Sequence, residues 1–213
     1  MSAVIGITYI HLLGALGVTA ASSVRPISDS AVAYIIEIVL VFVLLFAMLA
    51  ISPGPLKYVL FALFAVVMGQ LLAKFVARLK ADNVLKDVLV TVAGIFLAMT
   101  ALGFYDNQNI LGFGPYLLAA LFGLIVARVL LMIGAFGGAS AGAVSSANNI
   151  LSWVGAALFS VYVAYDTQRL KELPLGLGGR GRRSRSSPDY VDASLGLFLD
   201  AINLFENVGD IMD

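Results

Sequence analysis

Long apolar runs separated by short polar breaks follow one another along almost the whole chain. A helix that crosses a bilayer needs about 20 mainly apolar residues, and seven stretches have this character. Pro53 and Pro55 end the second stretch, because proline interrupts a helix. We therefore predict an all-α integral membrane protein with seven transmembrane helices in a single membrane domain over residues 1–213. The predicted helices are about 3–21, 31–51, 56–79, 84–102, 111–133, 146–165 and 190–211.

Two of the connections between these helices are unusual. Gly134–Ser146 is rich in Gly, Ala and Ser, and we predict a flexible loop there. Its glycines do not follow a strand and no lysine follows them, which argues against a phosphate-binding loop. Arg169–Asp189 is rich in Arg, Gly and Ser, so we predict a solvated loop. Its basic residues favour the cytoplasmic side of the membrane. The number of spans has an alternative, because six spans followed by a re-entrant last segment also fit the sequence.

The first apolar run resembles a signal peptide only in its length and in its small residues near Ala21. No lysine or arginine precedes Arg25, so the basic start of a signal peptide is missing. We interpret this run as the first membrane helix.

The composition supports membrane insertion and excludes several kinds of site. Hydrophobic residues make up 61% of the 213 residues and charged residues 12%, whereas a soluble domain has about 25% charged residues. The mean hydropathy is +0.98, and we expect the lipid bilayer to be the main partner. The formal net charge is zero, so electrostatics give no reason to expect a nucleic-acid partner. There is no cysteine, and His11 is the one histidine, so we expect no metal centre built on these residues and no cofactor.

The last predicted helix carries a polar stripe. At 100° per residue its six polar side chains fall within about one third of the helix surface. A membrane helix turns such a stripe toward protein or water, which favours an ion or proton path. The alternative is that the stripe only joins helices through hydrogen bonds. The stripe consists of Asp192, Asp200, Asn203, Glu206, Asn207 and Asp210.

Two aspartates are the leading candidates for ion or proton chemistry. Asp200 lies about ten residues into the last helix, and a charged carboxylate at that depth costs about 2.5–3.5 kcal/mol on insertion scales. Asp166 ends the sixth predicted helix; taken alone, it is equally well explained as an interfacial residue beside Arg169 and Lys171. If the two carboxylates approach each other, they share a proton, and the pair senses pH. Carboxylate oxygens also suit Ca²⁺, so we expect Asp166 and Asp200 to bind calcium transiently as a permeant ion.

The residues around both aspartates resemble those of a known family. Leu158–Gln168 (LFSVYVAYDTQ) and Asp189–Phe205 (DYVDASLGLFLDAINLF) are similar to the two signatures of the transmembrane Bax-inhibitor-motif family, also called the Bax inhibitor/LifeGuard family. The two signatures occur in the family's order, and together they cover the C-terminal quarter of the chain. The order and hydropathy of the remaining segments also fit this family.

The resemblance implies both a fold and a function. Family members have seven helices with the last enclosed by the other six, and Asp166 and Asp200 correspond to the pH-sensing di-aspartyl pair of bacterial relatives. Relatives leak Ca²⁺ from stores and protect cells from apoptosis, which implies apoptosis-related membrane proteins as partners. Glu37 resembles an acidic residue of relatives and is a candidate pore-lining or supporting residue, like the rest of the polar stripe. The implied location is the endoplasmic reticulum, Golgi or plasma membrane in a cellular or viral setting, and the inner membrane in a bacterium.

The chain also departs from its relatives. Some of them carry a basic residue near the end of helix two that latches onto the helix-six aspartate, and here no basic residue precedes Lys57 in that stretch. Arg128 is a candidate substitute, although its place near the outer end of helix five argues against it. The run before the first helix is very short, so we expect no proline-rich arm of the LifeGuard type.

Two other functions fit parts of the pattern. Intramembrane aspartyl proteases also place aspartates in adjacent helices, but they need a Gly-x-Gly-Asp sequence where this chain has Phe198 and Leu199 before Asp200. We therefore do not expect an enzyme. A non-conducting anti-apoptotic scaffold is the main alternative to the channel or transporter, because Gly14 and Gly17 give the first helix a face suited to close helix contact.

Overall fold

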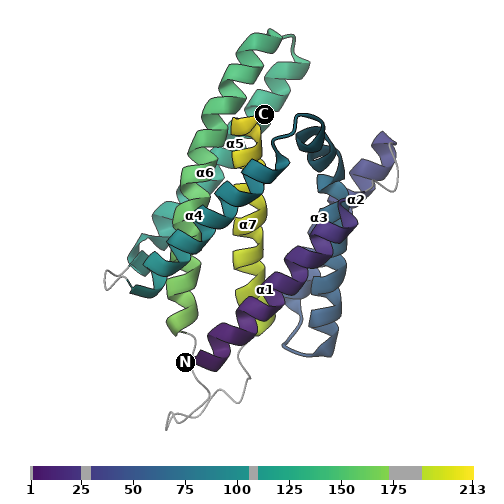
Figure 1. The fold of residues 1–213 in the computed structure, drawn as a ribbon. Helices are drawn as coiled ribbons and strands as arrows, with labels where there is room; N and C mark the ends of the chain where they lie inside the picture. Colours follow the sequence, from purple (N-terminus) through teal and green to yellow (C-terminus); the bar gives the residue numbers. More distant parts are fainter. Residues whose placement is uncertain (1, 25–29, 106–109, 173–188) are drawn as a thin grey trace. The chain divides into compact units, whose positions relative to one another are not determined.

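The computed structural model describes residues 2–24, 30–105, 110–172 and 189–213, and these residues form helices and no strands (Figure 1). Six helical segments are long and apolar enough to cross a membrane, and α7 is a further helix with four acidic residues. The prediction of an all-α membrane protein is confirmed. The elements are α1 (Ser2–Ser22), α2 (Ala31–Ala50), α3 (Pro55–Ala81), α4 (Leu85–Tyr105), the 3-10 turn η1 (Ile110–Phe113), α5 (Gly114–Phe136), α6 (Ala141–Glu172) and α7 (Tyr190–Met212).

The helices form two compact units. The first comprises Met1–Ala81 and Leu170–Phe198, and so contains α1, α2, α3 and the first part of α7. The second comprises Asp82–Arg169 and Leu199–Asp213, and so contains α4, α5, most of α6 and the rest of α7. The polar stripe of α7 is thereby divided, because Asp192 belongs to the first unit and its other members belong to the second.

In the first unit, α3 packs against both α1 and α2. The hydroxyl of Thr19 on α1 donates a hydrogen bond of 2.9 Å to the backbone oxygen of Ala65 on α3. Gly69 lies so close to Ser22 that any Cβ at this position would overlap it. Small residues allow membrane helices to approach closely and form such interhelical hydrogen bonds, so this contact fixes α1 on α3.

Phe198 holds the first part of α7 in the same unit. Its ring makes edge contacts with Phe61 and Phe64 of α3, at centroid distances of 5.8 and 5.9 Å. One aromatic pair of this kind contributes about 0.5–1.5 kcal/mol beyond its buried area. The hydroxyl of Ser194 also donates to the backbone oxygen of Thr8 on α1, at 3.0 Å. α7 therefore starts against both α1 and α3.

In the second unit, α5 and α6 form a helical hairpin with a four-residue connection, residues 137–140 (Figure 1). The predicted loop Gly134–Ser146 is longer than this connection, because α5 ends later and α6 begins earlier than the sequence predicts. Gly138 takes a positive φ of 93°, which glycine adopts readily, and the chain reverses there. The hydroxyl of Ser140 then accepts a 3.3 Å hydrogen bond from the backbone N–H of Ala143. This N-cap starts α6 five residues earlier than the sequence predicts.

Close approaches at glycine also hold α6 to the helices beside it in this unit. A Cβ on Gly103 of α4 would lie 2.6 Å from the backbone oxygen of Ala164. A Cβ on Gly114, the first residue of α5, would lie 2.7 Å from the hydroxyl oxygen of Tyr165. At Gly103 only glycine allows the two backbones to come so close, whereas at Gly114 the missing side chain leaves room for the Tyr165 hydroxyl. Both contacts fall on the part of α6 that carries Asp166.

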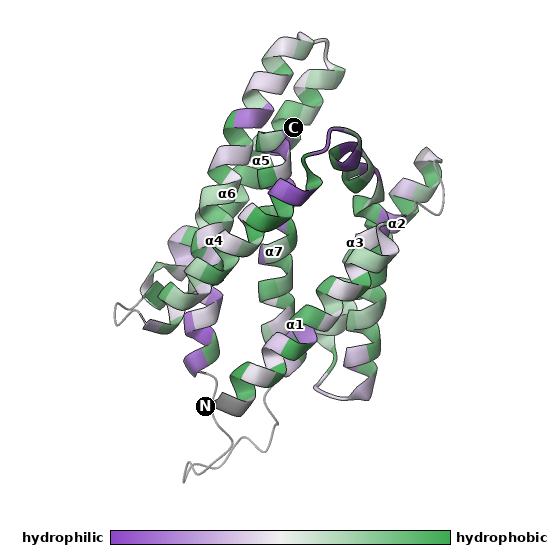
Figure 2. Cartoon of the chain, in the orientation of Figure 1, coloured by the Kyte–Doolittle hydropathy of each residue, from purple (hydrophilic) through white to green (hydrophobic). Residues whose placement is uncertain are grey.

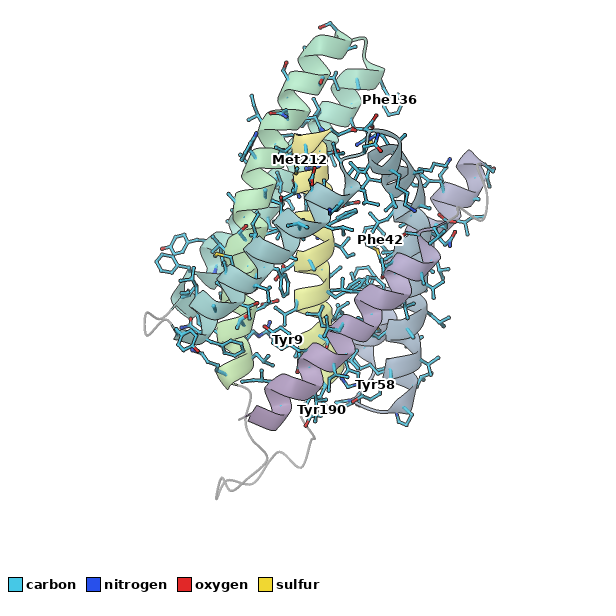
Figure 3. All side chains as sticks on the ribbon, viewed as in Figure 1. Tyr9, Phe42, Tyr58, Phe136, Tyr190 and Met212 are labelled. Carbon is cyan, nitrogen blue, oxygen red and sulfur yellow. The ribbon has the colours of Figure 1, made fainter. Side chains whose placement is uncertain are left out.

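The outer helices and α7 differ in what they expose. Apolar residues dominate α2, α4 and α5 (Figure 2), and many of their large apolar side chains are exposed. Phe136 at the end of α5, for example, is 88% exposed and extends away from the ribbon (Figure 3). In α7, by contrast, Asp192 is the one exposed position, and buried residues occur on every side of the helix. Exposed apolar helices suit contact with lipid, and a helix buried on all sides suits the interior of a membrane protein.

Candidate functional site

Asp200 is a buried carboxylate without a hydrogen-bond donor for one of its oxygens. It lies in the middle of α7 and is 5% exposed. Within the described part of the chain, its Oδ2 atom accepts no hydrogen bond. A buried oxygen of this kind normally needs a donor, a proton or a cation. Asp200 is therefore placed for proton or ion chemistry.

Asp166 belongs to the same unit and lies within electrostatic range of Asp200. Sequence analysis placed Asp166 at the end of helix six, and that prediction is wrong, because α6 continues to Glu172. Asp166 is half-buried inside the helix, with Arg169 one turn further along and close enough to interact with its charge. The predicted loop beyond α6 falls mainly on residues 173–188, which lie outside the described residues.

Tyr162 adds a phenol to this pair. It precedes Asp166 by four residues, so both side chains lie on the same face of α6, and it interacts electrostatically with both carboxylates. A phenol hydroxyl can donate a hydrogen bond to a carboxylate or accept one from a carboxylic acid. The structure therefore places Asp166, Asp200 and Tyr162 in one unit and within electrostatic range of one another. That the two aspartates share a proton or bind calcium stays a prediction.

The second half of the polar stripe makes hydrogen bonds with α5 and α6. Arg128 of α5 donates to the side-chain oxygen of Asn207 at 2.7 Å and to the hydroxyl of Ser152 at 3.4 Å. The hydroxyl of Ser152 and the amide of Asn148 each lie 3.4 Å from Asp210 Oδ2. Sequence analysis considered Arg128 as a partner for the helix-six aspartate, and the structure instead places it against Asn207.

The remaining stripe residues are half-buried. Asn203 donates its side-chain amide to the backbone oxygen of Leu199 in its own helix, at 2.7 Å. Glu206 interacts electrostatically with Arg128 and with Asp210. The stripe thus meets protein along the whole of its length in this unit.

Asp192 belongs to a separate ionic cluster in the first unit. Lys57 Nζ lies 2.5 Å from Asp189 Oδ2 and 2.6 Å from Asp192 Oδ1. The other oxygen of Asp189 accepts a 3.1 Å hydrogen bond from the backbone N–H of Asp192, so Asp189 also caps α7. Tyr58 and Tyr190, the chain neighbours of Lys57 and Asp189, mark these helix ends in Figure 3. This ionic cluster fastens the start of α7 to the start of α3.

Glu37 is half-buried on α2, in the first unit. Among the residues that the structure describes, it makes no ion pair or side-chain hydrogen bond. Glu37 thus makes no ion pair with Lys57 among the described residues, and it belongs to a different unit from Asp166 and Asp200.

Sequence analysis missed the residues that form ion pairs and hydrogen bonds around these acidic residues. Lys57 was noted only as lying too late in the sequence for the latch of relatives, and Asp189 only as part of a signature. One signal was available for Asp189, since an aspartate directly before a predicted helix is a typical N-cap. Ser152 and Asn148 gave no signal of their own. As for metals, no group of three or more acidic or histidine side chains able to hold an ion occurs over the described ranges.

Comparison with known proteins identifies the family. The sequence model described as inhibitor of apoptosis-promoting Bax1 matches residues 1–213, which is the whole of this chain. The chain belongs to the Bax inhibitor family. The resemblance found in the sequence is therefore confirmed, and this Bax inhibitor family protein is a multi-pass membrane protein.

Its relatives among known proteins include several from bacteria. It is 34% identical over 125 residues to an uncharacterized protein of Deinococcus radiodurans, covering 57% of this chain and 49% of the relative. It is 30% identical over 138 residues to an uncharacterized protein of Caulobacter vibrioides, and the match covers 65% of this chain and 51% of that relative. It is 30% identical over 175 residues to the inner membrane protein YbhL of Escherichia coli K12, and the match covers 80% of this chain and 68% of that relative. The matches thus span about half the length of the first two relatives.

Proposed function

We propose that this Bax inhibitor family protein is a pH-sensitive calcium leak channel or transporter in which Asp166 and Asp200 form the pH-sensing part of the ion path. The observation that carries the proposal is the buried Asp200 Oδ2 without a donor, within electrostatic range of a second carboxylate. In a low-dielectric interior two neighbouring carboxylates do not both carry a charge at low cost. The pair therefore holds a proton in one state and attracts a cation in the other.

The pair suits a passing ion better than a resident one. Bound Ca²⁺ takes six to eight oxygen ligands, and two aspartates supply at most four. Water or backbone oxygens complete the shell while the ion moves on. Glu206 and Asp210 continue the acidic surface along α7 beyond Asp200. By the helix rise, Asp210 lies about 15 Å from Asp200 along the axis, so a cation leaving the pair meets further carboxylates.

The location and the cellular role rest on the family. The name of the Escherichia coli relative states an inner membrane, and we propose the same membrane for this chain in a bacterium. The description of the matching family model concerns apoptosis-promoting Bax. From it we propose that the protein is cytoprotective when expressed in an animal cell, by lowering stored Ca²⁺ and through contact with apoptosis-related membrane proteins.

Calcium flux into liposomes containing the purified protein tests the proposal. We expect Ca²⁺ entry with the wild-type protein, and we expect Asp200→Asn and Asp166→Asn each to change the flux by about ten-fold or more, because each removes a charge from a low-dielectric path. Asp87→Asn is the matched control, since Asp87 is an exposed carboxylate of the same unit on α4. Wild-type protein that is folded but conducts no Ca²⁺ at any pH contradicts the proposal and favours the scaffold.

A further inference from the structure

Arg128 is a charged residue well inside a membrane-spanning helix. It lies eight residues before Phe136, the end of α5, which corresponds to about 12 Å along the helix. Its neighbours Ile125 and Val129 are exposed apolar residues, whereas Leu124, one turn earlier on the same face, is buried. Arg128 therefore points away from the lipid-facing side of α5. An ionisable residue in this position usually serves a path or an ion pair.

The contacts of Arg128 direct it at α7. Its guanidinium donates to Asn207 at 2.7 Å and reaches the hydroxyl of Ser152 at 3.4 Å. Asn207 is buried and Ser152 is fully buried. Asn207 in turn donates its amide to the backbone oxygen of Asn203, at 2.6 Å. The guanidinium is thus held by side chains from two helices and is not free to leave for the membrane surface.

The charge of Arg128 acts on acidic residues of the same unit. Glu206 lies within electrostatic range of both Arg128 and Asp210. Asn148 and Ser152 of α6 hold the Asp210 carboxylate from the other side. The guanidinium of Arg128 and the carboxylate of Asp210 thus both reach the hydroxyl of Ser152, and Glu206 lies within electrostatic range of each. A guanidinium keeps its charge at every accessible pH.

We infer that Arg128 is the fixed positive charge of the ion path, held by Asn207 and Ser152, and that it limits how readily divalent cations pass the second half of α7. The inference rests on the proposed function and adds a second control point to it. A fixed positive charge within a few ångströms of a passing Ca²⁺ raises its energy steeply in a low-dielectric interior. Arg128 thus sets the size of the leak, whereas the aspartate pair sets its dependence on pH.

Calcium flux into liposomes separates the contributions of these charges. We expect Arg128→Gln to raise the flux by about ten-fold, because the fixed positive charge that repels a passing cation is then absent. We expect Glu206→Gln to lower it by a similar factor, because an acidic side chain that attracts cations is then absent while Arg128 is kept. The double variant Arg128→Gln/Glu206→Gln returns the flux to within about two-fold of wild type, since net charge is restored.

Controls keep the inference falsifiable. Lys86→Gln removes an exposed cation of the same unit at the start of α4 and leaves the flux unchanged. Arg128→Lys keeps the charge and stays close to wild type. If Arg128→Gln does not fold, the Glu206→Gln variant still tests the inference, because this variant keeps Arg128 in place. The expected result is a fall in calcium flux. If the wild-type protein conducts Ca²⁺ and neither Arg128→Gln nor Glu206→Gln alters the flux, the inference about Arg128 is wrong. The proposed function is not contradicted by that result. Absent wild-type flux overturns the proposed function instead.

Discussion

Asn207 connects three helices through one side chain. Its oxygen accepts from Arg128 on α5, its amide donates to Asn203 on α7, and its amide group lies against Gly155 on α6. A Cβ at position 155 would overlap the Asn207 amide. The absence of a side chain at Gly155 is therefore what allows Asn207 to be in place for Arg128.

This arrangement predicts the effect of the smallest possible side chain. We expect Gly155→Ala to destabilise the protein by about 1–3 kcal/mol, because the added methyl group displaces the Asn207 amide and strains the packing. Gly123→Ala is the control: Gly123 lies on α5 of the same unit and has open space around its Cβ position. It should be neutral or slightly stabilising, since alanine favours helix over glycine. Reversible unfolding in detergent measures both, and equal stability of the two variants contradicts the assigned role of Gly155.

At the scale of elements, the start of α7 depends on Lys57. Lys57 is 1% exposed and pairs with the N-cap residue of α7 and with Asp192 in its first turn. Carboxylates at a helix N-terminus are favoured by the helix dipole, and Lys57 balances their charge. The ionic cluster thus serves both the capping of α7 and its attachment to α3.

Removing Lys57 should loosen this end of α7. We expect Lys57→Met to lower the free energy of unfolding by about 1–2 kcal/mol; the loss is limited because Asp192 stays partly exposed to water. Lys80→Met on the same helix α3 is the control, since Lys80 is exposed. Hydrogen exchange of the first turn of α7 should rise in Lys57→Met alone. Unchanged exchange in that variant would show that the cluster does not hold α7 to α3.

The helices were predictable because the thickness of the bilayer sets their length and makes each one an apolar run. The α7 stripe was predictable because its polar residues repeat with the period of one helix. The end of α6 was not: Thr167 and Gln168 interrupt the apolar run, but both are buried and the helix continues through them. A drop in hydropathy marks the end of an apolar surface, which is not always the end of a helix.

The partners of the site residues were beyond sequence analysis for a different reason. The contact of Arg128 with Asn207 joins residues 79 positions apart, and that of Lys57 with Asp189 joins residues 132 apart. Such pairs depend on how helices are placed in space, which the period of one helix does not encode. From the residues alone, the approach of Asp166 to Asp200 was only a condition of the hypothesis, and the resemblance to a family is what implied it.

At the scale of the whole molecule, apolar side chains face outward on α2, α4 and α5, and α7 is buried almost throughout. Four acidic residues, Asp192, Asp200, Glu206 and Asp210, lie on this largely buried helix. A membrane protein tolerates buried carboxylates where they face protein or a wet cavity. The central claim is that two of them, Asp166 and Asp200, act as one proton-sharing unit that sets ion flow.

The most direct test of this claim is calcium flux in liposomes between about pH 6 and 8, for wild type, Asp166→Asn, Asp200→Asn and the double variant. If the two carboxylates share one proton, either single substitution removes the pH dependence and the second adds nothing further. If the two carboxylates titrate independently, each substitution instead removes only part of the pH dependence, and the effects of the two substitutions add. Additive effects, or a pH dependence that survives in the double variant, would contradict the account.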